Sequence, residues 1–444
     1  MSFMNTLARQ LYSLLTMLGQ PLLRRKLARR GLHEPGYLEA VEERFGHYIQ
    51  PGETASELVW LHAVSLGETR TAAMLLKALR AQHPGLRILL THGTATGRAE
   101  GRTLLQHGDV QVWQPWDSPA VVARFFAHFK PRLGLLMETE IWPNLVVQAQ
   151  ARAMPLLLVN GRLSEKSLKN ALRLALLSRP AYGALTAVFA QTAADAARFS
   201  QLGATVSGVF GNLKFDARPS VSQQAQGKAW RRAVAQPVLM FASSRDGEEE
   251  LFLKQISVVV QQERLHAAID SVAYAGSKNV RFLIVPRHPQ RFDEAEALIK
   301  QHGLSVSRRS GWDGSPADND EAMQADVWLG DTLGEMARYF GLSDVALLGG
   351  SFAPLGGQNL IEAAACGCPV VMGPHTFNFT EAAEMAQAEG AALRSADMAE
   401  AVHAGLRLIS NPPALAAAVA AGLAFSARNQ GATARTVGAL RGCL

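Results

Sequence analysis

Short apolar runs alternate with longer stretches of helical periodicity along most of this chain. This alternation limits the possible folds more than any other feature of the sequence. The run from Asp344 to Leu348, which leads into a glycine turn, is typical of a strand buried in a parallel sheet. Residues 69–82, in contrast, place Ala73, Leu76 and Leu79 on one face of a helix. The alternation predicts doubly wound α/β domains with parallel sheets.

The predicted strands form two series, which indicates two domains. The first series comprises residues 58–62, 86–91, 110–114, 133–137, 156–159, 188–191 and 206–208, and the second comprises residues 238–242, 281–285, 305–308, 325–329, 344–348 and 369–372. Residues 216–226 between them are polar, so we place the linker there. We predict two Rossmann-like domains, residues 32–215 and 216–444, that face one another across a cleft, with the Ala-rich helices after residue 393 packing back across the hinge.

Residues 1–31 differ from the rest and are predicted to anchor the protein to a membrane. The stretch from Leu7 to Leu23 is largely apolar but rather short for a bilayer span, and residues 24–30 contain five basic residues. An apolar helix followed by a basic cluster is typical of a segment held in or across an anionic membrane surface. An ordinary packing helix with a solvated basic end is the alternative. Whether the helix spans the membrane or lies flat in its interface is left open.

The overall composition narrows the possible partners. The formal net charge of +6 favours an acidic partner, such as an anionic lipid, a phosphorylated substrate or a nucleic acid. The aromatic residues are not interleaved with basic patches, which disfavours nucleic acid. Three cysteines are too few for a disulfide framework, and Cys366-Gly-Cys368 has no second pair of zinc ligands nearby. Without a Walker lysine motif or a carboxylate pair after a suitable strand, we predict no metal site.

The stretch from Gly349 to Phe379 has the features of an anion-binding corner. A predicted strand ends at a pair of glycines, and Gly356 and Gly357 form a second flexible corner. Asn359 stands where a helix begins, with Glu362 at the position of its capping-box partner. A glycine loop before a helix N-terminus can hold a phosphate at the carboxyl edge of a parallel sheet, and Glu362 can accept a ribose hydroxyl. A tight turn without a ligand is the alternative.

Two motifs place carboxylates at strand ends of the first series. In HAVSLGE, Glu68 is a candidate general base, but Ser65 and Glu68 also have capping-box spacing, and from spacing alone we favour the cap. In METEIWPN, Glu138 and Glu140 follow an apolar strand and would point the same way if the strand continued. A cluster that starts a helix is the alternative for this second motif.

Two basic residues and a second helix N-cap are the remaining candidates for the functional site. Lys214, in GNLKFD, is placed to neutralise a carboxylate or a phosphate, and Arg287, in VPRHP, suits bidentate phosphate recognition at a strand end. Thr332 and Glu335 have capping-box spacing, so the helix after them would present a positive N-terminus. A solvated lysine, a surface ion pair and an ordinary cap are the respective alternatives.

Taken in order, HAVSLGE, METEIWPN, NGRLS, GNLKFD, VPRHP, GDTLGE and the glycine-rich stretch that ends in MGPHTFNF resemble the motifs of one family. The chain is similar to the Kdo transferases of lipopolysaccharide synthesis, which transfer 3-deoxy-D-manno-octulosonic acid (Kdo). The resemblance implies a GT-B type glycosyltransferase on the cytoplasmic face of the inner membrane, where anionic lipids would be partners. The donor would be CMP-Kdo and the acceptor the acylated glucosamine disaccharide phosphate precursor of lipid A, with no cofactor.

The resemblance also implies roles for particular residues. Glu68 corresponds to the family's general base, and Glu138 and Lys214 to its supporting charged residues. The family's contacts to CMP fall on Pro286, Arg287, Leu333, Gly334, Glu335, Asn359, Leu360, Ile361 and Glu362. Transfer would invert the anomeric configuration, because an acceptor hydroxyl deprotonated by Glu68 attacks from the face opposite CMP.

Two other functions remain possible on the sequence alone. One is an enzyme of the same architecture that acts on another nucleotide sugar, such as a UDP-hexosamine transferase or epimerase. An epimerase would not need residues 1–30. The other is a catalytically silent, membrane-bound adaptor that binds CMP-sugars or lipid, and it would tolerate a change at Glu68.

Overall fold

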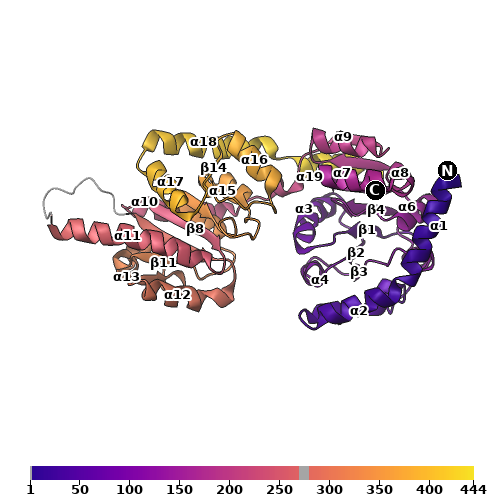
Figure 1. The fold of residues 1–444 in the computed structure, drawn as a ribbon, viewed down its shortest axis with the longest axis horizontal. Helices are drawn as coiled ribbons and strands as arrows, with labels where there is room; N and C mark the ends of the chain where they lie inside the picture. Colours follow the sequence, from indigo (N-terminus) through magenta and orange to yellow (C-terminus); the bar gives the residue numbers. More distant parts are fainter. Residues whose placement is uncertain (1–2, 270–279) are drawn as a thin grey trace. The chain divides into compact units, whose positions relative to one another are not determined.

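The structure is a computed structural model that describes residues 3–269 and 280–444, and it divides the chain into two compact units (Figure 1). The first unit comprises Met1–Asp216 and Asn429–Leu444, and the second comprises Ala217–Arg428. The division falls at the start of the polar segment in which we placed the linker. That segment is not all linker, however, because α10 (Val221–Ala233) begins inside it, with the hydroxyl of Ser220 accepting a hydrogen bond from the Gln223 amide. The linker prediction was wrong for residues 221–226, where this N-cap outweighs the polar composition.

The first unit is built on a sheet of seven parallel strands in the order β3-β2-β1-β4-β5-β6-β7. The strands are β1 (Val59–His62), β2 (Ile88–His92), β3 (Val110–Trp113), β4 (Leu133–Met137), β5 (Leu156–Gly161), β6 (Ala187–Ala190) and β7 (Val206–Val209). Each of them overlaps a predicted run, and the prediction of a parallel α/β sheet in this part of the chain is confirmed.

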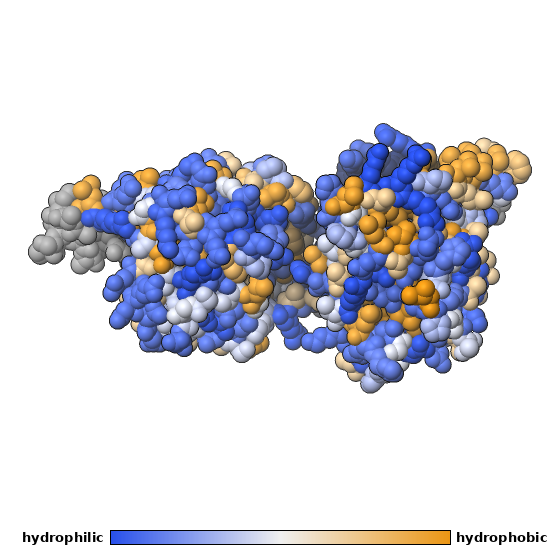
Figure 2. All heavy atoms as spheres, turned by 90° about the horizontal axis from the view of Figure 1, so that it is seen from below, coloured by the Kyte–Doolittle hydropathy of each residue, from blue (hydrophilic) through white to orange (hydrophobic). Residues whose placement is uncertain are grey.

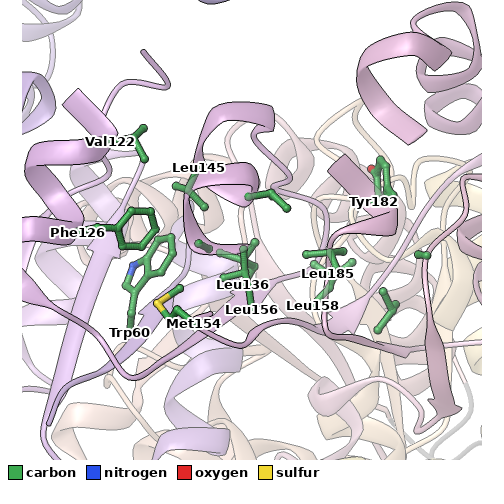
Figure 3. Close-up of a cluster of buried hydrophobic side chains, with 14 of the residues drawn as sticks. Trp60, Val122, Phe126, Leu136, Leu145, Met154, Leu156, Leu158, Tyr182 and Leu185 are labelled. Atoms are coloured by element: carbon green, nitrogen blue, oxygen red, sulfur yellow. The ribbon is translucent and has the colours of Figure 1, made fainter. Parts of the chain in front are cut away.

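Helices cover both faces of this sheet (Figure 1). They are α1 (Phe3–Leu18), α2 (Gln20–Gly31), α3 (Leu66–Gln82), α4 (Ala95–Arg102), α5 (Pro119–Phe129), α6 (Pro143–Ala151), α7 (Glu165–Arg173), α8 (Ala175–Gly183), α9 (Ala193–Gln201) and α19 (Ala432–Leu440), with the 3-10 turns η1 (Pro35–Leu38), η2 (Val41–Phe45) and η3 (Leu213–Asp216). Successive strand residues point to opposite faces, so Trp60 packs with α5 and α6 whereas Leu61 belongs to the core on the side of α3 and α19. Figure 3 shows the first of these clusters, in which Trp60 lies beside Phe126 and Met154.

Helix α19 belongs to the first unit although it follows the second unit in sequence. Its residues Ala432, Val437 and Leu440 are buried in the core that α3 covers. The carboxylate of Asp216 accepts hydrogen bonds from the backbone amides of Gly431 and Thr433 at the start of this helix. The core of the first unit is therefore assembled from two separate stretches of sequence.

The second unit contains another sheet of seven parallel strands, in the order β10-β11-β9-β8-β12-β13-β14. The strands are β8 (Val238–Ser244), β9 (Arg281–Pro286), β10 (Val306–Arg308), β11 (Val327–Leu329), β12 (Val345–Leu348), β13 (Val370–Met372) and β14 (Ala392–Arg394). The helices around it are α10, α11 (Glu248–Ile269), α12 (Phe292–Gln301), α13 (Asp320–Gln324), α14 (Met336–Leu342), α15 (Leu360–Cys366), α16 (Thr380–Ala388), α17 (Met398–Ile409) and α18 (Pro412–Asn429). The prediction of helix from residue 393 was wrong for β14, where parallel pairing with β13 outweighs the Ala-rich composition.

The strand order reverses at β1 in the first sheet and at β8 in the second, and these reversals position the loops of interest. In the first unit β1 lies between β2 and β4, so the loops after His62 and Met137 leave adjacent strands at the same carboxyl edge. In the second unit β8 lies between β9 and β12, which brings together the loops after Ser244 and Leu348. Open parallel sheets bind their ligands at such reversals.

The N-terminal apolar stretch is divided into two helices that are fastened to the first unit. Helix α1 ends at Leu18, and α2 starts with Pro21 in its first turn. The Ser13 hydroxyl donates to the Asn144 side chain at 2.9 Å, and the Trp116 indole N–H donates to the carbonyl of Thr16 at 2.6 Å. Among the residues that the structure describes, no single helix is long and apolar enough to cross a membrane.

Helix α1 nevertheless exposes a row of large apolar side chains. They include Phe3, Leu7, Leu11, Leu14, Leu15 and Leu18, each at least half exposed. Figure 2 shows this hydrophobic surface at the right-hand end of the view, over α1. The helix is therefore docked by its polar face and leaves its apolar face uncovered.

Candidate functional site

Glu68 lies in the first turn of α3, directly after β1. The Ser65 hydroxyl caps this helix by accepting a hydrogen bond from the Glu68 backbone N–H at 3.3 Å. In return, the Glu68 carboxylate accepts hydrogen bonds from the Ser65 hydroxyl and the Val64 amide, each at 2.9 Å. The cap that the spacing predicted is thus present, except that the carboxylate reaches the amide of Val64 and the hydroxyl, not the amide, of Ser65.

The environment of Glu68 raises its pKa from 4.5 to about 7. Burial is the largest cause, and the negative charges of Glu138 and Glu140 act in the same direction. The hydrogen bonds from Val64 and Ser65 oppose the shift but do not cancel it. A carboxylate with a pKa near 7 is well matched to accept a proton from a substrate hydroxyl at neutral pH.

Strand β4 ends at Met137 and does not continue through Glu138. The prediction that Glu138 and Glu140 point the same way required a continued strand, so this condition is not met. The φ of Glu138 is +60°, in the left-handed region that non-glycine residues seldom adopt. Two backbone hydrogen bonds hold this strained conformation. The Glu138 amide donates to the carbonyl of Val159, and the Glu138 carbonyl accepts from the Arg162 amide. Local strain of this kind persists only where the surrounding structure fixes it, and it is concentrated at functional sites.

Lys214 forms an ion pair with Glu138, with Nζ 3.3 Å from Oε1. Both side chains are partly exposed at the carboxyl edge of the first sheet. Lys214 lies on turn η3, which the side chain of Asn160 positions by accepting a hydrogen bond from the Leu213 amide at 2.9 Å. The structure therefore brings together the three charged residues Glu68, Glu138 and Lys214 that the sequence singled out.

His62, at the end of β1, is fully buried, and its Nδ1 lies 2.8 Å from the Thr91 hydroxyl. Burial lowers its pKa to about 3, so the imidazole is uncharged at neutral pH. His62 is therefore an uncharged packing residue.

The residues predicted to contact a nucleotide follow β9, β11 and β12 of the second unit. Pro286 ends β9, and the amide of Arg287 donates to the carbonyl of Ser244 at 3.0 Å. Arg287 lies close enough to Glu362 to lower the pKa of that carboxyl, although burial outweighs this effect and raises it overall. The Asn359 side chain caps α15 by accepting a hydrogen bond from the Ile361 amide at 3.1 Å.

The side chains of Leu360 and Ile361 are fully buried in the core of the second unit. Any contact between these two residues and a ligand would therefore involve the backbone. In the neighbouring loop, Leu333 is exposed and Gly334 adopts a φ of +77°, a conformation that favours glycine.

Glu335 is held by partners within the protein. Its carboxylate accepts from the Thr332 hydroxyl at 2.6 Å and forms ion pairs with Arg309 and Arg338. Burial opposes ionisation, but these partners outweigh it and lower the pKa of Glu335. Helix α14 begins only at Met336, so Glu335 occupies the N-cap position and the predicted helix start at Thr332 was wrong. The positive φ of Gly334 prevents the helix from starting earlier.

Glu248 was missed by the sequence analysis, although it organises the glycine-rich loop after β12. It is fully buried, and its carboxylate accepts from the amides of Gly350, Phe352 and Ala353 at 2.7, 3.0 and 3.1 Å. The acidic run at residues 248–250, directly after the switch-point strand β8, was the available signal. The loop thus takes its shape from a carboxylate about 100 residues earlier in the chain.

Comparisons with known proteins indicate the family to which this chain is related. A family model described as 3-deoxy-D-manno-octulosonic-acid transferase (kdotransferase) matches residues 39–217. The chain is 47% identical over 387 residues to the 3-deoxy-D-manno-octulosonic acid transferase of Bordetella pertussis. The aligned region covers 86% of each of the two chains. It is 30% identical over 374 residues to the protein of the same name from Haemophilus influenzae, and this aligned region covers 83% of each of the two chains.

Solved structures are similar in fold over most of the chain. UDP-GlcNAc 2-epimerase from Neisseria meningitidis matches with 14% identity and a TM-score of 0.55, over 86% of this chain and 99% of that one. MurG from Acinetobacter baumannii matches with 13% identity and a TM-score of 0.52, over 87% and 99%. At these identities the likeness concerns the fold alone.

Two parallel-sheet α/β units with ligand loops at their strand reversals, together with these structural neighbours, place the chain in the GT-B fold class of glycosyltransferases. Within this class, the identity to the Bordetella pertussis protein over most of both chains decides the family. The chain belongs to the Kdo transferase family.

Proposed function

We propose that this protein is an inverting glycosyltransferase that moves Kdo from CMP-Kdo to the acylated glucosamine disaccharide phosphate precursor of lipid A. The observation that supports it most strongly is the Glu68 carboxyl group, which has a pKa of about 7 at the strand reversal of the first unit. In a chain that belongs to the Kdo transferase family, such a group is suited to activate the acceptor hydroxyl.

In the proposed reaction, Glu68 takes the proton of the acceptor hydroxyl. The hydroxyl oxygen forms a bond to the anomeric carbon of Kdo while the bond from that carbon to the CMP phosphate oxygen breaks. Because attack comes from the face opposite the leaving group, the configuration inverts. The electron pair of the broken bond leaves with CMP, whose phosphate becomes more negative as the bond lengthens.

The second unit supplies groups suited to bind that phosphate. We assign this role to Arg287 and to the backbone amides of the loop at residues 333–335 and of residues 359–360 at the start of α15, because a cation and oriented amide dipoles stabilise developing negative charge. Glu362, whose pKa is raised by burial, is assigned to a ribose hydroxyl.

In the first unit we assign Glu138 and Lys214 a supporting role. The Glu138 charge helps to raise the pKa of Glu68, and Lys214 holds the strained Glu138 in place through their ion pair. The positive charge of Lys214 also lies beside the Glu138 carboxylate and reduces the repulsion between Glu138 and Glu68.

We place the protein on the cytoplasmic face of the inner membrane. The uncovered apolar row of α1 suits a helix lying in the interface, and the basic residues of α2 suit the anionic headgroups beside it. A phosphorylated lipid acceptor would be met at the same surface.

The direct test is to incubate the full chain with CMP-Kdo and the lipid A precursor and to follow the product by mass spectrometry and its anomeric configuration by NMR. We expect a product that has gained Kdo, with inverted configuration, and release of CMP. UDP-GlcNAc serves as the control substrate. Turnover of UDP-GlcNAc without any Kdo transfer would contradict the proposal and favour an epimerase.

The pKa of Glu68 also predicts how transfer depends on pH. Because only the ionised carboxylate accepts a proton, kcat should rise about tenfold between pH 6 and pH 8, with an apparent pKa of about 7. The measurement is a pH profile of kcat at saturating donor and acceptor. A flat profile over this range would contradict Glu68 as the base.

A further inference from the structure

A cavity of about 320 Å³ lies in the first unit between α2 and the loops that follow strands β1 to β4. Val64 forms part of its wall, and the Val64 amide donates to the Glu68 carboxylate at 2.9 Å. Glu140, whose charge contributes to the raised pKa of Glu68, lines the cavity as well. The cavity therefore adjoins the proposed base.

Three cationic side chains line this cavity: Lys26 and Arg30 from successive turns of α2, and Arg44 from η2. Within residues 3–269 and 280–444, no carboxylate forms an ion pair with any of the three. Arg44 is only 8% exposed, its guanidinium lies 3.7 Å from the ring centre of Trp113, and its Nε has no hydrogen-bond partner in the described part of the chain. Burial lowers the pKa of Arg44 to about 10, and the nearby charge of Glu43 opposes this shift without cancelling it. A buried cation whose charge is only partly offset by its surroundings suits an anionic ligand.

The two acidic groups of the cavity differ in their surroundings. The Asp117 carboxylate accepts from the amides of Asn144 and Leu145 at 3.0 and 2.8 Å, at the start of α6. Burial raises the pKa of the Glu140 carboxyl, which favours its uncharged form. Asp117 is therefore occupied by protein donors, whereas the hydrogen bonds that the structure shows from Arg30 and Arg44 go to uncharged oxygens, the Tyr37 hydroxyl at 3.3 Å and the Gly93 carbonyl at 3.1 Å. The positive charges are thus still open to an anionic ligand.

The remaining walls are aromatic and aliphatic. Tyr37, Trp116 and Trp142 line the cavity together with Leu23 and Leu27. Flat aromatic faces beside cations suit a phosphorylated sugar, because the apolar face of a sugar ring packs on an aromatic ring while arginine and lysine bind the phosphate.

We propose that this cavity binds a phosphorylated sugar of the acceptor, with Lys26, Arg30 and Arg44 on its phosphate and the tryptophans on its ring. The inference rests on the proposed function, since it places the acceptor next to Glu68. It goes further by assigning part of α2 to substrate recognition, whereas the basic residues of that helix otherwise serve only the membrane surface.

Helix α2 offers a matched control. Arg25 and Arg29 are exposed residues of the same helix and do not line the cavity. Two double variants are compared. The first combines Lys26→Gln and Arg30→Gln, and the second combines Arg25→Gln and Arg29→Gln, so each removes two positive charges from α2. In uncharged detergent micelles, the first pair should raise the KM for the phosphorylated acceptor about 10- to 100-fold at nearly unchanged kcat, and the second should change KM less than twofold. Equal effects of both pairs would overturn the proposal, because the charge would then act only at the membrane surface.

A binding experiment separates this proposal from the transfer reaction. Calorimetric titration of the full chain with a glucosamine disaccharide phosphate that lacks acyl chains should show binding that the Lys26→Gln, Arg30→Gln pair weakens about tenfold or more. The dephosphorylated disaccharide and inorganic phosphate should each bind more weakly. Inorganic phosphate binding as tightly as the disaccharide phosphate would overturn the assignment to a sugar phosphate. Binding without any Kdo transfer by the unaltered protein would leave this site standing and contradict the proposed function alone.

Discussion

Glu68→Gln is expected to lower the rate of Kdo transfer about 10²-fold or more without lowering Tm. The amide cannot take a proton, but it keeps an oxygen that accepts from the Val64 amide, and the Ser65 cap on the Glu68 backbone N–H does not depend on the side chain. The measurements are kcat from CMP-Kdo to the lipid A precursor and thermal unfolding of the same preparation.

The same substitution makes a prediction about stability and pH. The pKa of Glu68 is raised in the folded state, so the stability associated with its protonated form is present at low pH and is lost as the pH rises towards and through 7. The Gln variant lacks this loss. Its Tm relative to the unaltered protein should therefore increase between pH 5 and pH 8.

Glu400 provides the control for capping. It has the same position in α17 that Glu68 has in α3: its amide donates to the N-cap Asp397 at 2.8 Å, and its carboxylate accepts from the Ala396 amide at 2.7 Å. Glu400→Gln should leave transfer unchanged. Near-normal transfer by the Glu68 variant, or an equal loss in both, would show that Glu68 is only a cap.

Glu248→Ala is expected to give the largest loss of stability. It leaves the buried amide of Gly350 and the partly buried amides of Phe352 and Ala353 without their acceptor, and a fully buried group left unpaired costs about 1–3 kcal/mol. A total of about 3–5 kcal/mol corresponds to a fall in Tm of roughly 6–20 °C for a unit of this size. CMP binding should also weaken, because the loop that leads to Asn359 loses its support.

Glu250→Ala is the matched control, since Glu250 lies in the same helical turn but is exposed and forms an ion pair with Lys254 at the surface. Thermal unfolding should show no measurable change for this variant. Glu248→Gln, which keeps one acceptor oxygen, should fall between the two. If Glu248→Ala unfolds at the temperature of the unaltered protein, the carboxylate does not support the loop.

The strands were predictable because their signal is local. Buried parallel strands are continuous apolar runs, and β4 was predicted with its observed bounds, Leu133–Met137. Strand β14, in contrast, has only three residues and a composition that favours helix, and it exists because β13 offers an edge to pair with. Such a strand depends on tertiary structure that a local pattern does not contain.

The candidate site was predictable in its residues but not in its geometry. The motifs pointed to Glu68, Glu138 and Lys214, yet the left-handed backbone of Glu138 depends on hydrogen bonds to Val159 in β5 and to Arg162 just after that strand. The support of the glycine-rich loop by Glu248 joins positions about 100 residues apart. Contacts of this range follow from the strand order, which periodicity does not reveal.

The placement of α19 has a consequence for how the chain is made. The ribosome delivers residues in order, so the entire second unit emerges before Ala432, Val437 and Leu440 are available to the core of the first. Until then, the face of the first sheet that α3 and α19 share exposes apolar side chains. We expect the second unit to reach its native packing earlier than the first, which reverses the usual order in which domains mature during synthesis.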